Sequence, residues 1–235
     1  MGKPVALVTG SNRGIGFEVV RRLAERGYLV YLAARRPGAA EEAAGELSGR
    51  GLAVRPLVLD VTQDGSVRRA REHVEAESGR LDALVNNAGV LLDEDRRLLG
   101  LELPIEAVRA TYEVNTFGPL RVTQAFALLL MRQGGNVVNV SSVMGQLASA
   151  GPGYLAYRSS KAALNMITRV LAAELKPHGV RVNAVHPGWI RTRMGGPEAP
   201  GRPEEGAEPI VWLATLGPDG PTGGFFGPGN RPLDW

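Results

Sequence analysis

The chain has 235 residues, 44% of them hydrophobic and 22% charged, a composition typical of one globular domain with a substantial core. The net charge is only +3, and no long basic run or basic stripe interleaved with aromatic residues is present, so nucleic acid is not expected as a partner. The absence of cysteine excludes disulfides, thiolate metal sites and thiol catalysis. The three histidines (His73, His178 and His186) are too scattered to predict a metal site.

The N-terminus enters an apolar strand directly, and the longest apolar run, residues 125–131, is too short to span a bilayer. We therefore expect a soluble, cytoplasmic protein without a membrane partner.

Short apolar runs alternate with segments of helical periodicity along the chain. Strands are expected at residues 4–9, 28–34, 53–59, 82–86, 136–140, 180–185 and 223–226. Helices are expected between them, at residues 14–26, 39–48, 65–78, 105–132, 157–176 and 204–216.

Strands that are apolar almost throughout are typical of a sheet covered on both faces, and regular strand–helix alternation predicts that the sheet is parallel. The expected fold is one Rossmann-type, doubly wound α/β domain over residues 1–235, with the functional loops at the carboxyl ends of the strands. Pro, Gly and Glu crowd residues 194–209, which we expect to form a mobile loop.

A glycine-rich turn follows the first expected strand and precedes the first helix. Glycine lets the backbone turn sharply and admits a pyrophosphate, while the helix N-terminus offers free N–H groups to the anion. The turn is therefore expected to bind a dinucleotide through Gly10, Asn12, Arg13, Gly14, Ile15 and Gly16.

The end of the second strand indicates which dinucleotide is bound. An acidic residue there would bind the adenosine 2′-hydroxyl, but this chain has Ala34 followed by Arg35 and Arg36. Two guanidinium groups, with Arg13 as a third cation, favour the 2′-phosphate of NADP(H). NAD(H) stays possible, because these could be ordinary surface arginines.

The next two strand ends fit the same ligand. Asp60 and Val61 follow the third strand, where a carboxylate could accept from the adenine amino group. Asn87, Ala88 and Gly89 follow the fourth, where small residues allow the cofactor to approach the backbone. Each motif alone could be turn chemistry.

Tyr157 and Lys161 are four residues apart in an expected helix, which places phenol and ammonium on one face. A neighbouring ammonium and a positive nicotinamide ring would lower the tyrosine pKa from about 10 toward the working range. Taken alone, such a pair is more often an ordinary helix-surface pair.

The glycine turn, Asn87-Ala88-Gly89, Asn115, Ser142, the Tyr157–Lys161 pair and Pro187-Gly188, in this order, resemble the short-chain dehydrogenases/reductases of the common type. The resemblance covers nearly the whole chain and implies a seven-stranded parallel sheet with substrate held above its carboxyl edge. The opening turn and the ending Gly223–Phe226…Trp235 resemble the carbonyl reductase branch, without the long insertion before the tyrosine that some monomeric members carry.

The resemblance also implies roles. Tyr157 would be the general acid–base, Lys161 would bind the nicotinamide ribose and lower the tyrosine pKa, and Ser142 would polarise the substrate oxygen, with Ser141 as the adjacent alternative. Asn115 would bend its helix and hold a water that relays protons to Lys161. Contacts to the nicotinamide are implied for Pro187, Gly188, Ile190 and Thr192.

Two further implications concern the substrate and assembly. A substrate loop is expected at about residues 189–208. Relatives often carry a helical lid at residues 193–208, but this segment is short and rich in Pro and Gly, so the pocket is expected to be open. The spacing between Ser142 and Tyr157 is slightly longer than usual, which we expect to be a loop adjustment beside the pocket. Apolar candidates around it suggest an apolar or aromatic carbonyl compound: Val90, Leu91, Met144, Leu147, Tyr154, Trp189 and Met194. Relatives are mostly homodimers or homotetramers, through the helices that carry Asn115 and Tyr157.

The leading hypothesis is NADP(H)-dependent reduction of a ketone or aldehyde to an alcohol. The alternatives are an NAD-dependent alcohol dehydrogenase and a nucleotide-sensing protein that has lost catalysis. A sugar-nucleotide epimerase or dehydratase would need more C-terminal chain.

Overall fold

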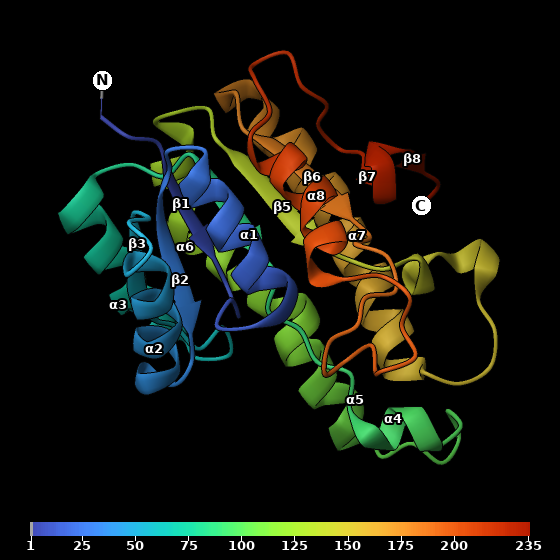
Figure 1. Cartoon of the computed structure of the whole chain (residues 1–235). Coiled ribbons are helices and arrows are strands. Elements are labelled where there is room, and N and C mark those ends of the chain that lie inside the picture. The colour runs from blue at the N-terminus through green and yellow to red at the C-terminus, as the bar shows by residue number, and fades with distance from the viewer. Residues whose placement is uncertain (1) are drawn as a thin grey trace.

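A twisted sheet of eight strands runs through the middle of the protein, with helices on both faces (Figure 1). The structure is a computed structural model and describes residues 2–235. The strands are β1 Val5–Val8, β2 Leu29–Ala34, β3 Val54–Val58, β4 Ala83–Asn86, β5 Asn136–Val140, β6 Arg181–Val185, β7 Phe225–Phe226 and β8 Pro232–Leu233. The helices are α1 Gly14–Glu25, α2 Pro37–Ser48, α3 Asp64–Ser78, α4 Asp93–Arg97, α5 Ile105–Tyr112, α6 Gly118–Met131, α7 Leu155–Leu175 and α8 Pro203–Ala214.

The predicted Rossmann-type fold is confirmed. The sheet order is β3-β2-β1-β4-β5-β6-β7-β8, and every pairing from β3 to β7 is parallel. The eighth strand, β8, pairs antiparallel with β7 and was not predicted. Its two residues, one of them a proline, are too few to show a strand pattern in the sequence.

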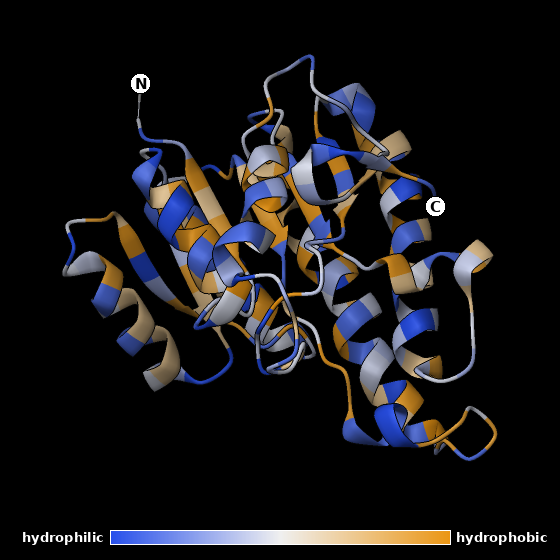
Figure 2. Ribbon diagram, turned by 45° about the vertical axis from the view of Figure 1, so that its right-hand side comes forward, coloured by the Kyte–Doolittle hydropathy of each residue, from blue (hydrophilic) through white to orange (hydrophobic). Residues whose placement is uncertain are grey.

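Two apolar cores separate the layers. On one face, β1 and β2 contribute Ala6, Val8 and Val30, which pack against α1, α2 and α8. On the other, Leu7 and Tyr31 pack against α3, α6 and α7. Neighbouring residues of a strand point to opposite faces, so strands apolar throughout are what two covered faces require. In Figure 2 the strands are mostly orange with some blue residues, and the helices carry both blue and orange residues.

The sheet order also fixes where a site can form. The chain builds β1, β2 and β3 toward one edge and returns to place β4 on the other side of β1. The turns after β1 and β4 therefore leave the same edge of the sheet side by side, and ligands of doubly wound sheets bind at such a switch point.

The helices differ in detail from those expected. The segment 105–132 is a continuous helical run interrupted by a π-helical turn, Glu113–Phe117, between α5 and α6. Helix α7 begins at Leu155, two residues before the expected start, and the short helix α4 was not predicted. No helix in residues 2–235 has the length and apolar character needed to cross a membrane.

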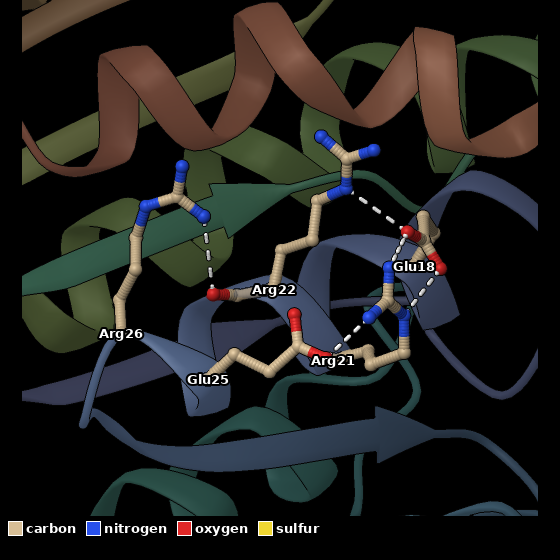
Figure 3. A network of polar contacts seen from close by, with 5 residues as sticks. All are labelled: Glu18, Arg21, Arg22, Glu25 and Arg26. Atoms are coloured by element: carbon tan, nitrogen blue, oxygen red, sulfur yellow. Dashed lines mark hydrogen bonds and ion pairs between the residues drawn. The ribbon is translucent and has the colours of Figure 1, made fainter.

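Helix α1 carries a compact ion network on its outer side (Figure 3). Glu18 is only 7% exposed and pairs with both Arg21 and Arg22, and Arg21 also reaches Glu25. Burial raises the pKa of Glu18, but the hydrogen bonds from the two arginines outweigh it and hold the pKa below its ordinary value. The charged form of Glu18 therefore stabilises the folded protein.

We predict that Glu18→Gln lowers the free energy of unfolding at pH 7 by about 1 kcal/mol, because two hydrogen bonds to a charged group lose their charge. The pKa of Glu18 is lower in the folded than in the unfolded chain, so its contribution is complete above the unfolded value and lost as pH falls below it. Urea unfolding of both proteins between pH 7 and pH 4 should show the gap closing. Glu25→Gln, at the exposed end of the network, is the control, and an equal loss in that variant would contradict the assignment.

Candidate active site

The turn after β1 lies directly against the turn after β4. A Cβ at Gly10 would be 2.8 Å from the Cα of Ala88, and one at Gly16 would be 2.5 Å from Nδ2 of Asn87. Asn87 in turn donates from Nδ2 to the carbonyl oxygens of Thr9 at 2.9 Å and Gly10 at 3.0 Å. Glycine is required here by packing between two loops, in addition to any demand of a ligand.

The start of α1 keeps its backbone donors available. Arg13 occupies the N-cap position with φ of −169°, and no side chain caps the helix. The side chain of the neighbouring Ile15 instead packs against the core beneath α1, α2 and α8. Uncapped N–H groups together with the helix dipole make this N-terminus suited to an anion.

Four arginines gather around that helix start. Burial lowers the pKa of Arg13, and so does repulsion from Arg193, Arg36 and Arg35. Three of the four were predicted, whereas Arg193, in the expected substrate loop at about residues 189–208, was assigned no role. Like charges are brought together at a cost, which a bound polyanion would offset.

The segment that carries Arg193 follows Pro187-Gly188 and returns to the glycine turn. The methyl carbon of Thr192 would be 3.4 Å from a Cβ at Gly14, and the side chain of Ile190 is buried. Residues 189–202 form a turn closed by an Ile190–Gly201 bridge, with Arg191 N donating to Gly201 O at 2.8 Å. Helix α8 then begins at Pro203, so the last part of the expected loop at 194–209 is helical.

Asp60 and Val61 have local partners. Asp60 Oδ1 accepts from the backbone N of Thr62 at 3.0 Å and from its hydroxyl at 2.8 Å. The side chain of Val61 packs against Gly118, where a Cβ would approach it to 2.8 Å. These contacts shape the turn after β3.

The structure brings Ser142, Tyr157 and Lys161 together at the carboxyl end of β5. Lys161 Nζ lies 5.7 Å from the centre of the Tyr157 ring and donates to the carbonyl of Val140 at 2.8 Å. The Ser142 side chain lies near the Tyr157 phenol, and its hydroxyl accepts from the backbone N of Met144 at 3.1 Å. Ser141, the alternative, donates to Asn165 at 2.5 Å.

Asn115 lies in the π-helical turn and ties it to the loop after β4. Its Nδ2 donates to Val90 O at 2.9 Å and to Ser160 Oγ at 3.2 Å, and its Oδ1 accepts from Val90 N at 2.8 Å. A Cβ at Gly89 would be 3.4 Å from Asn115 Oδ1 and 3.7 Å from Lys161 Nζ. Two members of the predicted catalytic set, Asn115 and Lys161, thus lie against the Gly89–Val90 backbone.

Burial dominates the electrostatics of this set. It raises the pKa of Tyr157, although the hydrogen bond with Ser142 and the charge of Arg96 oppose it. It also lowers the pKa of Lys161 to about 8. Both groups lie in a poorly solvated place that disfavours their charged forms. That Lys161 and the nicotinamide ring lower the tyrosine pKa stays a prediction for the protein with its cofactor bound.

Two polar residues of α4 were also missed by the sequence analysis. Asp95 is 1% exposed and accepts from the backbone N of Ala156 and Tyr157, and Arg96 donates to Met194 O at 2.5 Å. Their sequence gave no signal, since a short charged run ordinarily indicates a solvated surface. Among residues 2–235, no group of three or more His, Asp or Glu side chains could hold a metal ion.

Comparison with known proteins agrees with this architecture. A family model described as short chain dehydrogenase matches residues 4–202. The chain is 38% identical to a short-chain dehydrogenase, anuI, of Penicillium roqueforti, over 92% of this chain and 90% of that protein. It is 34% identical to carbonyl reductase [NADPH] 1 of Mus musculus, over 95% of each.

Two solved structures of related proteins superpose closely on this chain. A short-chain type dehydrogenase/reductase from Mycobacterium marinum superposes with a TM-score of 0.86 at 32% identity, over 95% of this chain and 93% of that chain. An NADPH-bound carbonyl reductase from chicken fatty liver superposes with a TM-score of 0.88 at 28% identity, over the full length of both chains.

The pKa of Lys161 leads to a prediction about stability. Between pH 8 and pH 10 the unfolded chain keeps this lysine protonated while the folded protein releases the proton. The free energy of unfolding therefore increases as pH rises through this range. Lys161→Met removes the buried charge, so its free energy of unfolding at pH 7 should exceed that of the native chain. This difference in the free energy of unfolding should shrink by about 2 kcal/mol by pH 10.

Urea unfolding without added nucleotide measures this gap. Lys176→Met, at an exposed lysine, is the control and should show no such trend. A gap for Lys161→Met that is constant with pH would contradict a charged, buried Lys161.

Proposed function

The chain belongs to the short-chain dehydrogenase family of oxidoreductases, and we propose that it reduces a ketone or aldehyde to an alcohol with NADPH. The observation that carries this proposal is the proximity of Tyr157, Ser142 and Lys161 at the carboxyl edge of the sheet. The cofactor then occupies the switch point beside them.

The residues present fit this cofactor. The uncapped start of α1 suits the pyrophosphate, with Gly10, Asn12, Gly14 and Gly16 forming the turn around it. Arg13, Arg35, Arg36 and Arg193 gather where an adenosine 2′-phosphate would lie, and a phosphate relieves the repulsion among them. The relatives named as NADPH-dependent or NADPH-bound carbonyl reductases support the same choice.

The remaining predicted contacts line the path from adenine to nicotinamide. Asp60 and Val61 would flank the adenine, and Asn87, Ala88 and Gly89 would lie along the cofactor. Pro187, Gly188, Ile190 and Thr192, on the segment that returns over the glycine turn, would hold the nicotinamide end.

Bound NADPH supplies the hydride that adds to the carbonyl carbon. Tyr157 donates the phenolic proton to the carbonyl oxygen, and Ser142 hydrogen-bonds that oxygen and polarises the carbonyl group. Lys161 orients the ribose and, while charged, stabilises the phenolate left on Tyr157. Asn115 holds the π-helical turn against Val90, beside Lys161, where a water can return the proton.

The alternative functions are less well supported. An NAD-dependent alcohol dehydrogenase would have no use for the arginines around the start of α1. An inactive nucleotide sensor would not need all four polar groups of the catalytic set.

The surroundings of the site support an apolar substrate. Trp189 is 58% exposed and Leu147 81% exposed, and both lie in segments that follow strands β6 and β5 at the carboxyl edge. Exposed large apolar side chains beside a site indicate the surface that a ligand covers. We therefore include apolar or aromatic carbonyl compounds as the substrate class.

Assembly into a homodimer or homotetramer is part of the proposal. The outer surfaces of α6 and α7 expose Leu128, Met166 and Val170, which are 71%, 66% and 46% exposed. A second copy of the chain would cover these residues.

Tyr157→Phe removes only the phenolic hydroxyl, and we predict that it lowers kcat for NADPH-dependent reduction of 4-nitrobenzaldehyde by about 100- to 10,000-fold. The affinity for NADPH, measured by fluorescence titration, should stay within about twofold, since binding does not need the proton. Tyr154→Phe, at the neighbouring tyrosine, is the control and should keep normal turnover. Near-normal turnover of Tyr157→Phe would refute the mechanism.

The arginine cluster predicts cofactor choice. Replacing Arg35 and Arg36 by alanine should weaken NADPH binding at least ~10-fold, since hydrogen bonds between charged groups contribute about 1.5–3 kcal/mol each. NADH binding should hardly change, because NADH lacks the 2′-phosphate. The Arg68–Arg69 doublet on α3, exposed and distant in sequence, provides the matched control pair. A native preference for NADH would reject the argument.

A further inference from the structure

Helix α7, which carries Tyr157 and Lys161, lacks the local cap that a helix of its length ordinarily has. Its N-cap residue, Tyr154, is in the left-handed region with φ of 56° and ψ of 36°, and no capping bond comes from its side chain. Gly153, just before it, also has a positive φ of 76°. An N-cap residue ordinarily has an extended backbone and a short polar side chain that accepts from the second or third helical N–H. The sequence before α7 offers neither.

Asp95 of α4 takes the place of that cap from 60 residues upstream. Its Oδ1 accepts from Ala156 N at 3.1 Å, and its Oδ2 accepts from Tyr157 N at 2.8 Å. These are the second and third N–H groups of α7, the ones that a local cap would bind. Each carboxylate oxygen therefore takes one of the helix's unsatisfied donors.

The carboxylate is otherwise isolated. Asp95 is 1% exposed, and among residues 2–235 no basic side chain lies within ion-pair distance of it. Its neighbour Arg96 lies by Asp93 and hydrogen-bonds to Met194 instead. A buried carboxylate without a cation is stabilised here by two amide donors and by the positive end of the α7 dipole.

Since the backbone nitrogen of Tyr157 is one of the two donors, the position of the tyrosine depends on this contact. Ser142 lies on a different element, the loop after β5, so the phenol must be held in place from the side of α7. We propose that Asp95 is a positioning residue: it caps α7 from α4 and fixes Tyr157 for proton transfer to the carbonyl oxygen. The proposal rests on the proposed function for its catalytic consequence and on geometry alone for the cap.

Asp95→Asn tests the proposal with little change in volume. The amide can accept one N–H, but its NH₂ group faces the other donor, so one buried N–H of α7 loses its partner. We expect kcat for 4-nitrobenzaldehyde to fall about 10- to 100-fold, as misplacement of a reacting group does. The KM for the aldehyde and the affinity for NADPH should change less than about threefold, because Asp95 touches neither ligand in the proposed site.

The matched control is Glu94→Gln, which removes the same charge from the adjacent, exposed residue of α4. Turnover is expressed per NADPH-binding site, so that a fraction of misfolded protein does not lower it. Asp95→Ser, which keeps one acceptor oxygen, replaces Asp95→Asn if that variant does not fold, and should also lose turnover.

Hydrogen exchange gives an independent readout of the cap. In Asp95→Asn, the amides of Ala156 and Tyr157 should exchange at least ~10-fold faster, while the middle of α7 stays protected. If the native protein reduces no carbonyl compound with NADPH, the proposed function fails, and this exchange alone decides whether Asp95 caps α7. Unchanged exchange, unchanged turnover per site, or an equal loss in Glu94→Gln would overturn the proposal.

Discussion

At Gly10 and Gly16 the turn after β1 lies so close to the turn after β4 that any side chain would collide with it. That approach follows from the sheet order, in which β4 returns to the free side of β1, and the bonds from Asn87 to Thr9 and Gly10 hold it. The rest of the site depends on this contact. It leaves the start of α1 open to an anion and brings the Gly89–Val90 backbone against Asn115 and Lys161.

The predicted catalytic groups are buried in a way that sets their protonation. Burial raises the pKa of Tyr157, which favours its protonated form. It also lowers the pKa of Lys161 to about 8, so that this lysine loses its proton more readily. A protein optimised for stability alone would not place a lysine there, since the charged form is poorly solvated. The same surroundings suit a tyrosine that must donate a proton and a lysine that must respond to the charge beside it.

The site is assembled from segments far apart in the chain, and three contacts connect them. Asn115 joins the π-helical turn to the loop after β4, Asp95 joins α4 to α7, and Arg96 joins α4 to Met194 in the segment after β6. Asp95 and Arg96 are adjacent in α4. Asp95 holds the backbone of Tyr157, and Arg96 holds the segment that returns over the glycine turn. Geometry at the tyrosine is thus linked to the segment that lies over the proposed cofactor site.

Local patterns in the sequence determined the seven parallel strands, the covering helices and the order of the motifs, because apolar runs, helical periodicity and glycine turns are short-range signals. They also placed Tyr157 and Lys161 on one helix face. Only the tertiary structure decided that Asp95 caps α7, that Arg193 joins Arg13, and that residues 189–202 fold back on themselves. These contacts join residues farther apart than the few positions that a helix or strand spacing rule covers. The direction of the pKa shifts of Tyr157 and Lys161 was likewise decided by burial, which a helical i, i+4 spacing does not reveal.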